Sequence, residues 1–342
     1  EAHAAPRGKM TPEQENAIRW CIEGDRRSFG LGTAKQHDSA FKFYARSARV
    51  GYPPAMARLG TAYQLGQGVA ADEERSLLWF QRGARRGDLD AMNALGCLCE
   101  SGAFAPRLPQ DLGAAGSWYE RAADKGHLDA QTNLGYLYEK GLGVPRNPRA
   151  AAFWYERAAA KGYAKAQNNL GSLFYTGVGV RGGQDYEAAV RLYMQGAEQG
   201  HASAMNNLGI CKEDGLGTPV DKVGARALYE AASASGNVHA QNNLGYMCTA
   251  EGRFEEAAGH FRRAADQGSA DALYSLAQLY ESGRGEPRDL ERAARLYRAA
   301  ASAGNDMGLE GAARAEEQRT RDLEEEQQVA GAGQGGRDGG DE

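Results

Sequence analysis

A glycine recurs along this chain at a nearly constant interval, and each one closes a stretch of similar sequence. The intervals between successive closing glycines are 36, 39, 36, 38, 36, 32 and 36 residues. The closing glycines are Gly51, Gly87, Gly126, Gly162, Gly200, Gly236, Gly268 and Gly304. A period in this range is typical of a solenoid, in which no repeat buries a core alone and each covers the apolar face of its neighbour. The period therefore constrains the fold more than any other feature of the sequence.

Residues 127–162 show the repeat in its clearest form. The apolar residues of its first half have the spacing of one helix face, and they are Ala130, Leu134, Leu137 and Tyr138. The glycines Gly141 and Gly143 then break this helix. Asn147 stands where the N-cap of a second helix belongs, and Gly162 suits a left-handed C-cap. Each repeat is thus predicted to be a helical hairpin.

Three positions of the first helix are nearly constant when residues are counted from the one after a closing glycine. Position 4 is alanine in the second to eighth repeats, and position 8 is leucine. Position 9 is glycine in six of these repeats and alanine in the eighth. Glycine inside a helix costs about 1 kcal/mol relative to alanine. We therefore expect a neighbouring helix to pass too close to position 9 for a Cβ atom.

At these positions the chain resembles the Sel-1-like repeats, which are relatives of the tetratricopeptide repeats. The resemblance rests on A-x-x-x-L-G-x-x-Y, G-x-G-V and W-Y-x-x-A-A…G within residues 130–162, and related elements recur in residues 55–87 and 166–200. It extends from about Asn16 to Gly304. The resemblance implies an all-α fold, a right-handed α/α superhelical solenoid of helical-hairpin repeats that holds partner proteins. It does not identify the partner.

The repeat register divides the chain into four segments. Residues 1–15 are expected to form a flexible extension, and residues 16–304 eight repeats, of which the first is degenerate and caps the N-terminal end. Residues 305–329 are predicted to form a C-terminal capping helix, and the glycine-rich, acidic residues 330–342 to be disordered. The seventh repeat has a shortened loop at residues 250–254, as in an ordinary tetratricopeptide repeat.

The charge distribution argues against two classes of partner. The formal net charge is -5, and residues 310–342 alone contribute 10 acidic and 4 basic side chains. The rest of the chain is nearly neutral, so it offers neither a basic field for nucleic acid nor a polybasic stripe for a membrane. No run approaches the roughly 18 apolar residues of a membrane helix. We therefore expect protein partners, with no nucleic acid, no membrane insertion and no small-molecule cofactor.

Cysteine usage bears on the compartment. The five cysteines, Cys21, Cys97, Cys99, Cys211 and Cys248, share no repeat position, so they predict buried free thiols and no disulfide framework. The chain also has no Asn-x-Ser/Thr sequon. Both facts favour a soluble, cytoplasmic location. The chain begins at Glu1, however, which leaves open a targeting segment that has been cleaved.

The sequence gives no support to catalysis. The six histidines, His3, His37, His127, His201, His239 and His260, lack metal-ligand spacing. The Gly-x-Gly segments recur in five repeats, so turn geometry explains them better than phosphate binding does. Cys97 and Cys99 lie about 200° apart around a helix, which suits chelation poorly. We predict that the protein is not an enzyme and holds neither a metal nor a cofactor.

The candidate binding site is a groove lined by first helices, at positions 3, 6, 10 and 13. Asparagine amides that offer both donors and acceptors could hold an extended backbone, carboxylates would favour Lys or Arg in the partner, and tyrosines add contact area. The predicted groove residues are Asn93, Asn168, Asn206, Asn242, Glu100, Glu139, Glu213, Glu281, Tyr136, Tyr175 and Tyr246, with Asp90, Asp129 and Asp271 at position 3. The asparagines at position 7, Asn133, Asn169, Asn207 and Asn243, are interpreted as bonding between repeats. For position 6 an ordinary polar surface is an equally good interpretation.

The function predicted from the sequence is a non-enzymatic scaffold or adaptor whose groove holds an extended polar or basic segment of a partner. One alternative is a structural subunit of a larger assembly that is bound through its outer surfaces. Another is a hydrolase of the cysteine-rich branch of the family, although the paired-cysteine pattern of that branch is missing here. A chaperone-like or degradation adaptor and a signalling scaffold both remain compatible with the resemblance.

Overall fold

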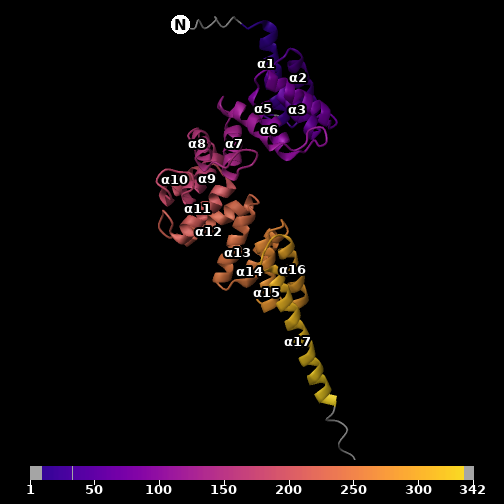
Figure 1. Cartoon of the computed structure of the whole chain (residues 1–342). Coiled ribbons are helices and arrows are strands. Elements are labelled where there is room, and N and C mark those ends of the chain that lie inside the picture. The colour runs from indigo at the N-terminus through magenta and orange to yellow at the C-terminus, as the bar shows by residue number, and fades with distance from the viewer. Residues whose placement is uncertain (1–9, 33, 335–342) are drawn as a thin grey trace, which may run out of the picture. The chain divides into compact units, whose positions relative to one another are not determined.

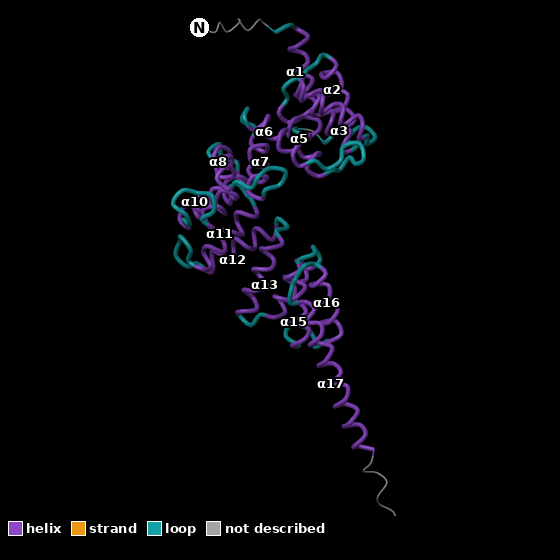
Figure 2. Tube along the Cα trace, in the orientation of Figure 1, coloured by secondary structure: helices purple, strands orange, loops and turns teal. Residues whose placement is uncertain are grey.

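The computed structural model describes residues 10–32 and 34–334, and this part of the chain is built from α-helices joined by short loops (Figures 1 and 2). Within these residues the only β-type pairing is an isolated bridge between Phe104 and Leu108. The all-α prediction is confirmed. Consecutive helical hairpins pack against one another as a solenoid. The helices form two compact units, residues 1–184 and 185–342, which divide in the loop of the fifth repeat.

The N-terminal unit contains nine helices in its described residues. In chain order they are α1 (Pro12–Phe29), α2 (His37–Arg49), α3 (Pro53–Leu65), α4 (Glu73–Arg85), α5 (Leu89–Ser101), α6 (Leu112–Ala123), α7 (Leu128–Lys140), α8 (Pro148–Ala159) and α9 (Ala164–Thr176). Helices α1 and α2 pair as a hairpin, as do α3 and α4, α5 and α6, and α7 and α8.

The C-terminal unit contains eight helices in its described residues. They are α10 (Tyr186–Glu198), α11 (Ala202–Asp214), α12 (Lys222–Ala234), α13 (Val238–Ala250), α14 (Phe254–Ala265), α15 (Ala270–Ser282), α16 (Leu290–Ser302) and α17 (Gly308–Gln334). The shortened loop of the seventh repeat is present, because α13 ends at Ala250 and α14 begins at Phe254.

Each hairpin forms where the sequence places its caps. Asn147 accepts a hydrogen bond from the Ala150 amide at 3.1 Å, so it is the N-cap of α8 as predicted. Aspartates have the same role at the start of the second helix in the other N-capped hairpins, at Asp72, Asp111, Asp185, Asp221 and Asp289. Gly141 ends α7 in the left-handed conformation. The Gly-x-Gly segments are therefore caps and turns.

The position-9 glycines are explained by an aromatic ring on the paired helix. A Cβ atom on Gly135 would lie 2.6 Å from Cε1 of Tyr155, a separation that real Cβ contacts do not reach. Other crowded pairs are Gly24 with Tyr44, Gly60 with Phe80, Gly96 with Tyr119, Gly209 with Tyr229 and Gly245 with Phe261. The expected close approach is thus made by a ring of the paired helix rather than by the backbone of a neighbouring helix.

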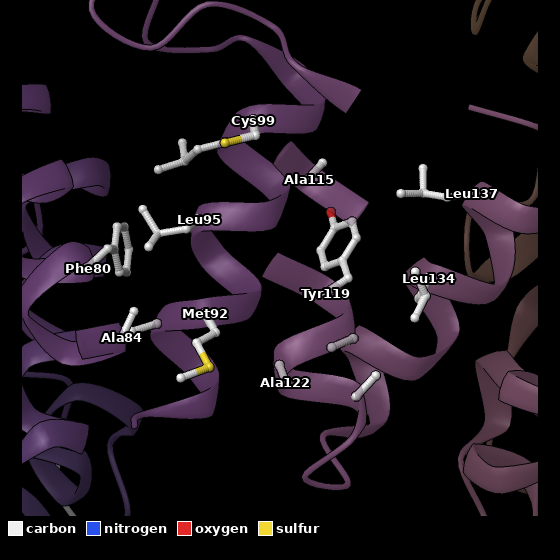
Figure 3. Close-up of a cluster of buried hydrophobic side chains, with 14 of the residues drawn as sticks. Phe80, Ala84, Met92, Leu95, Cys99, Ala115, Tyr119, Ala122, Leu134 and Leu137 are labelled. Atoms are coloured by element: carbon white, nitrogen blue, oxygen red, sulfur yellow. The ribbon is translucent and has the colours of Figure 1, made fainter. Parts of the chain in front are cut away.

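Small side chains and rings fill the core between successive hairpins. In the cluster of Figure 3, Phe80, Leu95 and Tyr119 lie on consecutive helix layers and are at most 2 % exposed. The loops also reach between repeats. Gly143 has φ 68°, and a Cβ atom there would collide with the Leu112 backbone at the start of α6. Only glycine combines that conformation with that approach.

The two ends of the repeat array differ from the sequence-based segments in their bounds. Helix α1 begins at Pro12 with a capping box between Thr11 and Gln14, whereas the repeats were expected to start at Asn16. Helix α17 continues to Gln334, past the expected end at residue 329. Residues 1–9 and 335–342, which contain most of the expected flexible and disordered segments, lie outside the described residues.

Candidate partner-binding surface

In the C-terminal unit, positions 10 and 13 of two successive first helices, α13 and α15, line a hollow. A cavity of about 370 Å³ is lined there by position 10 residues Tyr246 and Gln278 and position 13 residues Thr249 and Glu281. The ring of Phe261 also lines it. We call the residues at positions 10 and 13 of the first helices within each unit the first-helix surface.

Two tyrosines of this surface expose their rings to solvent. Tyr136 on α7 is 41 % exposed, and Tyr246 on α13 is 46 % exposed. The Tyr246 ring packs edge-on against Phe261 with 5.2 Å between ring centroids. A large, rigid ring that is held on one side and open on the other loses little entropy on binding a partner.

The four predicted glutamates each accept a hydrogen bond from a tyrosine of the same hairpin. Tyr155 donates to Glu139 at 3.0 Å, and Tyr229 donates to Glu213 at 2.8 Å. The same bond joins Tyr119 to Glu100 and Tyr297 to Glu281, at 2.5 Å in both cases. All four glutamates are half-buried. We call each such combination a Tyr–Glu pair.

The tyrosine of each pair is held in its protonated, donating form. Burial is the main cause that raises the pKa of Tyr155, and the Glu139 carboxylate raises it further. The same two causes raise the pKa of Tyr229 beside Glu213. The hydroxyl therefore remains protonated at neutral pH and donates to the carboxylate.

Where the ring on the paired helix is phenylalanine, position 13 is not acidic. Phe80 faces a helix with Gln64 at position 13, and Phe261 faces one with Thr249. Each glutamate at position 13 of a repeat thus occurs in a hairpin whose second helix carries a tyrosine, although a tyrosine also occurs without it in the first and fifth repeats. This co-occurrence within one sequence is the signal from which the Tyr–Glu pairs could be predicted.

Two of the four pairs also hold a cation of the chain itself. Glu281 accepts from Arg314 of α17, with Nε 2.8 Å from Oε1 and Nη2 3.0 Å from Oε2. The Arg314 guanidinium lowers the pKa of Glu281. Glu139 binds the ammonium of Lys140 at 2.6 Å through Oε1. The carboxylates of this surface are therefore able to bind cationic side chains.

The position 6 asparagines lie largely beneath the surface. Asn168, Asn206 and Asn242 are 9 %, 5 % and 6 % exposed, and Asn93 is half-buried. Asn243 donates to Asn206 at 2.9 Å, and Asn133 donates to Asn93 at 3.2 Å. These bonds run between adjacent repeats, as predicted for position 7. In both bonds the amide oxygen of the position 6 asparagine is the acceptor.

The position 3 aspartates also bond between repeats. Asp90 lies 3.0 Å from His127, Asp129 accepts from the Tyr163 hydroxyl, and Asp271 accepts from Asn305 at 3.1 Å. The partner is the first residue after the closing glycine, which is position 1 of the following repeat for His127 and Tyr163 and the start of the capping segment for Asn305. Tyr175 is half-buried, and its backbone carbonyl accepts from Gln184 at 2.8 Å. Tyr136, Tyr246 and the Tyr–Glu pairs thus form the accessible part of the predicted site.

The contacts of the histidines and cysteines indicate structural roles where they indicate any role. His127 and His201 are N-caps, whose Nδ1 atoms accept from backbone amides at 3.1 and 3.2 Å. All five cysteines are free, and four are buried, but Cys97 is exposed, contrary to the expectation for it. In the described residues no group of three or more His, Cys, Asp or Glu side chains could hold a metal ion. None of the helices described here has the length and apolar character needed to cross a bilayer.

Comparisons with known proteins agree with this architecture. The sequence profile of the Sel1 repeat matches residues 24–52, 53–88, 89–127, 128–163, 164–201, 202–237, 238–269 and 270–305. No curated protein matches the chain significantly.

Several solved structures resemble the chain, including the following two. A Sel1 repeat protein from Oxalobacter formigenes is 32 % identical, with a TM-score of 0.60 over 66 % of this chain and 91 % of that one. The protein c5321, a protective antigen of uropathogenic Escherichia coli strains with an SLR fold, is 28 % identical, with a TM-score of 0.56 over 86 % of this chain and 71 % of that one.

Proposed function

The chain belongs to the Sel1 repeat family, and from this membership we propose that it is a non-enzymatic scaffold whose first-helix surface binds an extended segment of a partner protein. Sel1 repeat proteins are generally protein-interaction scaffolds, and their fold is typically non-catalytic. The proposal adds the surface that is used and the kind of segment that it binds.

The observation that carries the proposal is the hollow at Tyr246. It combines an exposed ring, the neighbouring Phe261 and the Glu281 carboxylate within one cavity of about 370 Å³. A site of this kind suits one side chain of an extended peptide, with apolar contact from the rings and a fixed charge beside them. Tyr136 provides a second exposed ring at the same repeat position in the N-terminal unit.

The surface favours a basic or polar segment over an acidic one. Two of its carboxylates bind Arg314 and Lys140, and Glu100 and Glu213 offer the same charge at the same repeat position. The position 6 amides take no direct part in the proposal, because their hydrogen bonds join repeats. They hold the helices that present the rings and carboxylates.

The test replaces the exposed rings and leaves the Tyr–Glu pairs intact. Proteins crosslinked to the wild-type chain in native lysate are compared with those crosslinked to the Tyr136→Ala/Tyr246→Ala variant. Phe153→Ala on α8 is the matched control, because Phe153 is a ring that is 52 % exposed on a second helix. Circular dichroism confirms the fold of each variant.

We expect specific partners to be lost from the double variant and retained by Phe153→Ala. Loss with Phe153→Ala alone would transfer binding to the outer surfaces and support the assembly-subunit alternative. Retention of every partner by the double variant would show that the first-helix surface is not the binding site.

A further inference from the structure

We propose that the Tyr–Glu pairs of the third and sixth repeats, Glu100 with Tyr119 and Glu213 with Tyr229, each bind the guanidinium group of an arginine in the partner segment. The proposal rests on the proposed function and names the chemistry that the first-helix surface recognises. It is argued from two places where the chain seats its own arginine on an equivalent pair.

The first of these places is the pair in the eighth repeat. Arg314 makes two parallel hydrogen bonds to Glu281, at 2.8 and 3.0 Å, and its Nη2 lies 3.2 Å from the Tyr297 hydroxyl oxygen. Tyr297 donates its proton to Glu281 and can therefore accept from Nη2 with a free lone pair. The guanidinium carbon is 5.7 Å from the centroid of the tyrosine ring. The pair thus supplies three acceptor contacts arranged for a planar fork.

The second place is the first repeat, in the other compact unit. Tyr44 donates to Asp25 at 2.8 Å, and Arg58 of the next repeat donates to the same Oδ1 atom from its Nε at 3.0 Å. The acid here is an aspartate at position 10, so the geometry differs in detail from that of Glu281. The combination of a buried tyrosine, a carboxylate and an arginine is nevertheless the same. The first and last acid–tyrosine pairs of the array are therefore both occupied by arginine from within the chain.

At the two proposed sites, the repeat position that Arg314 occupies after the eighth repeat is an exposed tyrosine. Arg314 is at position 10 of the helix that follows the eighth repeat. The corresponding residue is Tyr136 after the Glu100 pair and Tyr246 after the Glu213 pair. An arginine delivered by a partner would meet this ring as well as the carboxylate, and guanidinium groups stack well on aromatic faces.

The carboxylates of the two proposed sites have no cation in the described part of the chain. Neither Glu100 nor Glu213 forms an ion pair among these residues. Lys212, next to Glu213, is instead held by Asp221 at 2.8 Å. The Glu139 pair is excluded from the proposal, because Lys140 occupies one of its oxygens.

Arginine is favoured over lysine by the shape of the site. Arg314 uses two nitrogens on two carboxylate oxygens and a third contact on the hydroxyl, whereas Lys140 makes one contact with Glu139. A lysine ammonium is a compact, strongly hydrated charge that cannot reproduce a bidentate fork. Replacing the recognised arginine by lysine should therefore weaken binding about tenfold.

The experiment selects binders from a displayed pool of random 12-residue peptides on immobilised protein. Selection is done with the wild-type chain, with Glu100→Gln/Glu213→Gln, and with Glu187→Gln as a control. Glutamine keeps the acceptor for tyrosine and removes the charge. Glu187 is 78 % exposed on the second helix α10. The recovered peptides are then measured by fluorescence anisotropy in arginine and lysine versions.

We expect arginine to be enriched over lysine with the wild-type chain and with Glu187→Gln. The enrichment should disappear with Glu100→Gln/Glu213→Gln. The lysine version of a selected peptide should bind about tenfold more weakly. Arg314→Ala, which frees the pair at Glu281, should raise the number of arginine peptides bound per chain.

Three results would overturn the inference, and they separate it from the proposed function. Peptides that are lost with Tyr136→Ala/Tyr246→Ala but bind equally well with lysine would leave the first-helix surface in place and refute the guanidinium site. The same conclusion follows if arginine enrichment survives in the double glutamine variant. If the selected peptides bind both Tyr136→Ala/Tyr246→Ala and Glu100→Gln/Glu213→Gln as tightly as the wild-type chain, the first-helix surface and the arginine sites are both refuted.

Discussion

The ring of Phe261 lies directly against Gly245 of the paired helix, so that a Cβ atom on this glycine would be 2.5 Å from Cε1 of the ring. Gly259, in the same hairpin, has nothing within 4 Å of an added Cβ. The two glycines therefore have opposite roles in helices of the same repeat. One is required by packing, and the other only loosens its helix.

The first prediction follows from this contrast. Gly245→Ala should lower the free energy of unfolding by about 1–3 kcal/mol, because the buried ring has to move. Gly259→Ala should raise it by up to about 1 kcal/mol, since alanine is the better helix former. Chemical denaturation of both variants measures the difference, and equal effects of the two substitutions would contradict the packing explanation.

The second prediction concerns the coupling between Tyr229 and Glu213. Glu213→Thr leaves a buried tyrosine hydroxyl without its acceptor and should cost about 1–3 kcal/mol. The double variant Tyr229→Phe/Glu213→Thr copies the natural combination of Phe261 and Thr249. Its loss of unfolding free energy should therefore be smaller than the sum of the losses in the two single variants. A double-mutant cycle of unfolding free energies tests this. A coupling energy of zero would mean that the bond adds nothing to the hairpin.

The third prediction concerns the junction between the sixth and seventh repeats. Asn206 is 5 % exposed and accepts from Asn243, so Asn206→Ala should destabilise the chain by about 1–3 kcal/mol through the amide left unpaired. Gln327→Ala, at an exposed position of α17, should have little effect. The comparison is made by thermal unfolding. If the unfolding temperature of Asn206→Ala were unchanged, the Asn206 amide would not be needed for stability, and a role of the position 6 amides in binding would be favoured instead.

The fourth prediction is a pH dependence of the docking of α17. Arg314 lowers the pKa of Glu281 below its ordinary 4.5, and Tyr297 and Arg288 also face this carboxylate. The contribution of Glu281 to stability is therefore complete above pH 4.5 and is lost as the pH falls through the lowered pKa. Arg314→Ala should cost about 1 kcal/mol at pH 7, a value that allows for partial exposure.

The measurement compares the wild-type and Arg314→Ala unfolding midpoints at pH 7 and at pH 3. The gap should narrow as the pH falls through the lowered pKa of Glu281, because protonation removes the charge that Arg314 binds. A gap that stayed constant would show that Arg314 acts on stability through packing rather than through the charge of Glu281.

The fifth prediction concerns thiol reactivity. Burial raises the pKa of Cys21 to about 12 and that of Cys211 to about 11. Partial desolvation raises the pKa of Cys97 as well, but its side chain is exposed, so a reagent reaches this thiol in the folded protein. At pH 8 a thiol reagent should modify one equivalent quickly in the native protein, and this phase should be absent from Cys97→Ser. All five cysteines should react after unfolding. A second fast thiol in the native protein would show that one of the buried sites opens.

The helical hairpins and their caps could be predicted from the sequence because they depend on local rules. The cap at Asn147 and the break at Gly141 require particular residue types at fixed offsets, and the repeat presents them several times. Periodicity alone assigns Ala130 and Leu134 to the buried face, and in the structure both are at most 1 % exposed. Repetition turned weak local preferences into a consistent pattern.

The candidate site was harder to predict because it depends on contacts between hairpins. Asn206 and Asn207 are neighbours on one helix near the edge of the buried face, and spacing does not tell which of them the next repeat covers. The partner of Glu213 is set by how deeply the Tyr229 ring enters the hairpin, which no periodicity reports. Only the start of helix α1 was wrong, because the Thr11–Gln14 capping box places it at Pro12 rather than at the expected Asn16.

The seat of Gly143 on the start of α6 has an evolutionary consequence. The same contact recurs in five repeats, where the second glycine of the loop lies against the start of the preceding second helix, at Gly68, Gly143, Gly179, Gly217 and Gly285. Duplication or loss of a segment cut at two closing glycines recreates this contact at the new joint, whereas a cut within a hairpin leaves a loop without support. The array is therefore free to lengthen or shorten by recombination, but only in steps of one whole repeat.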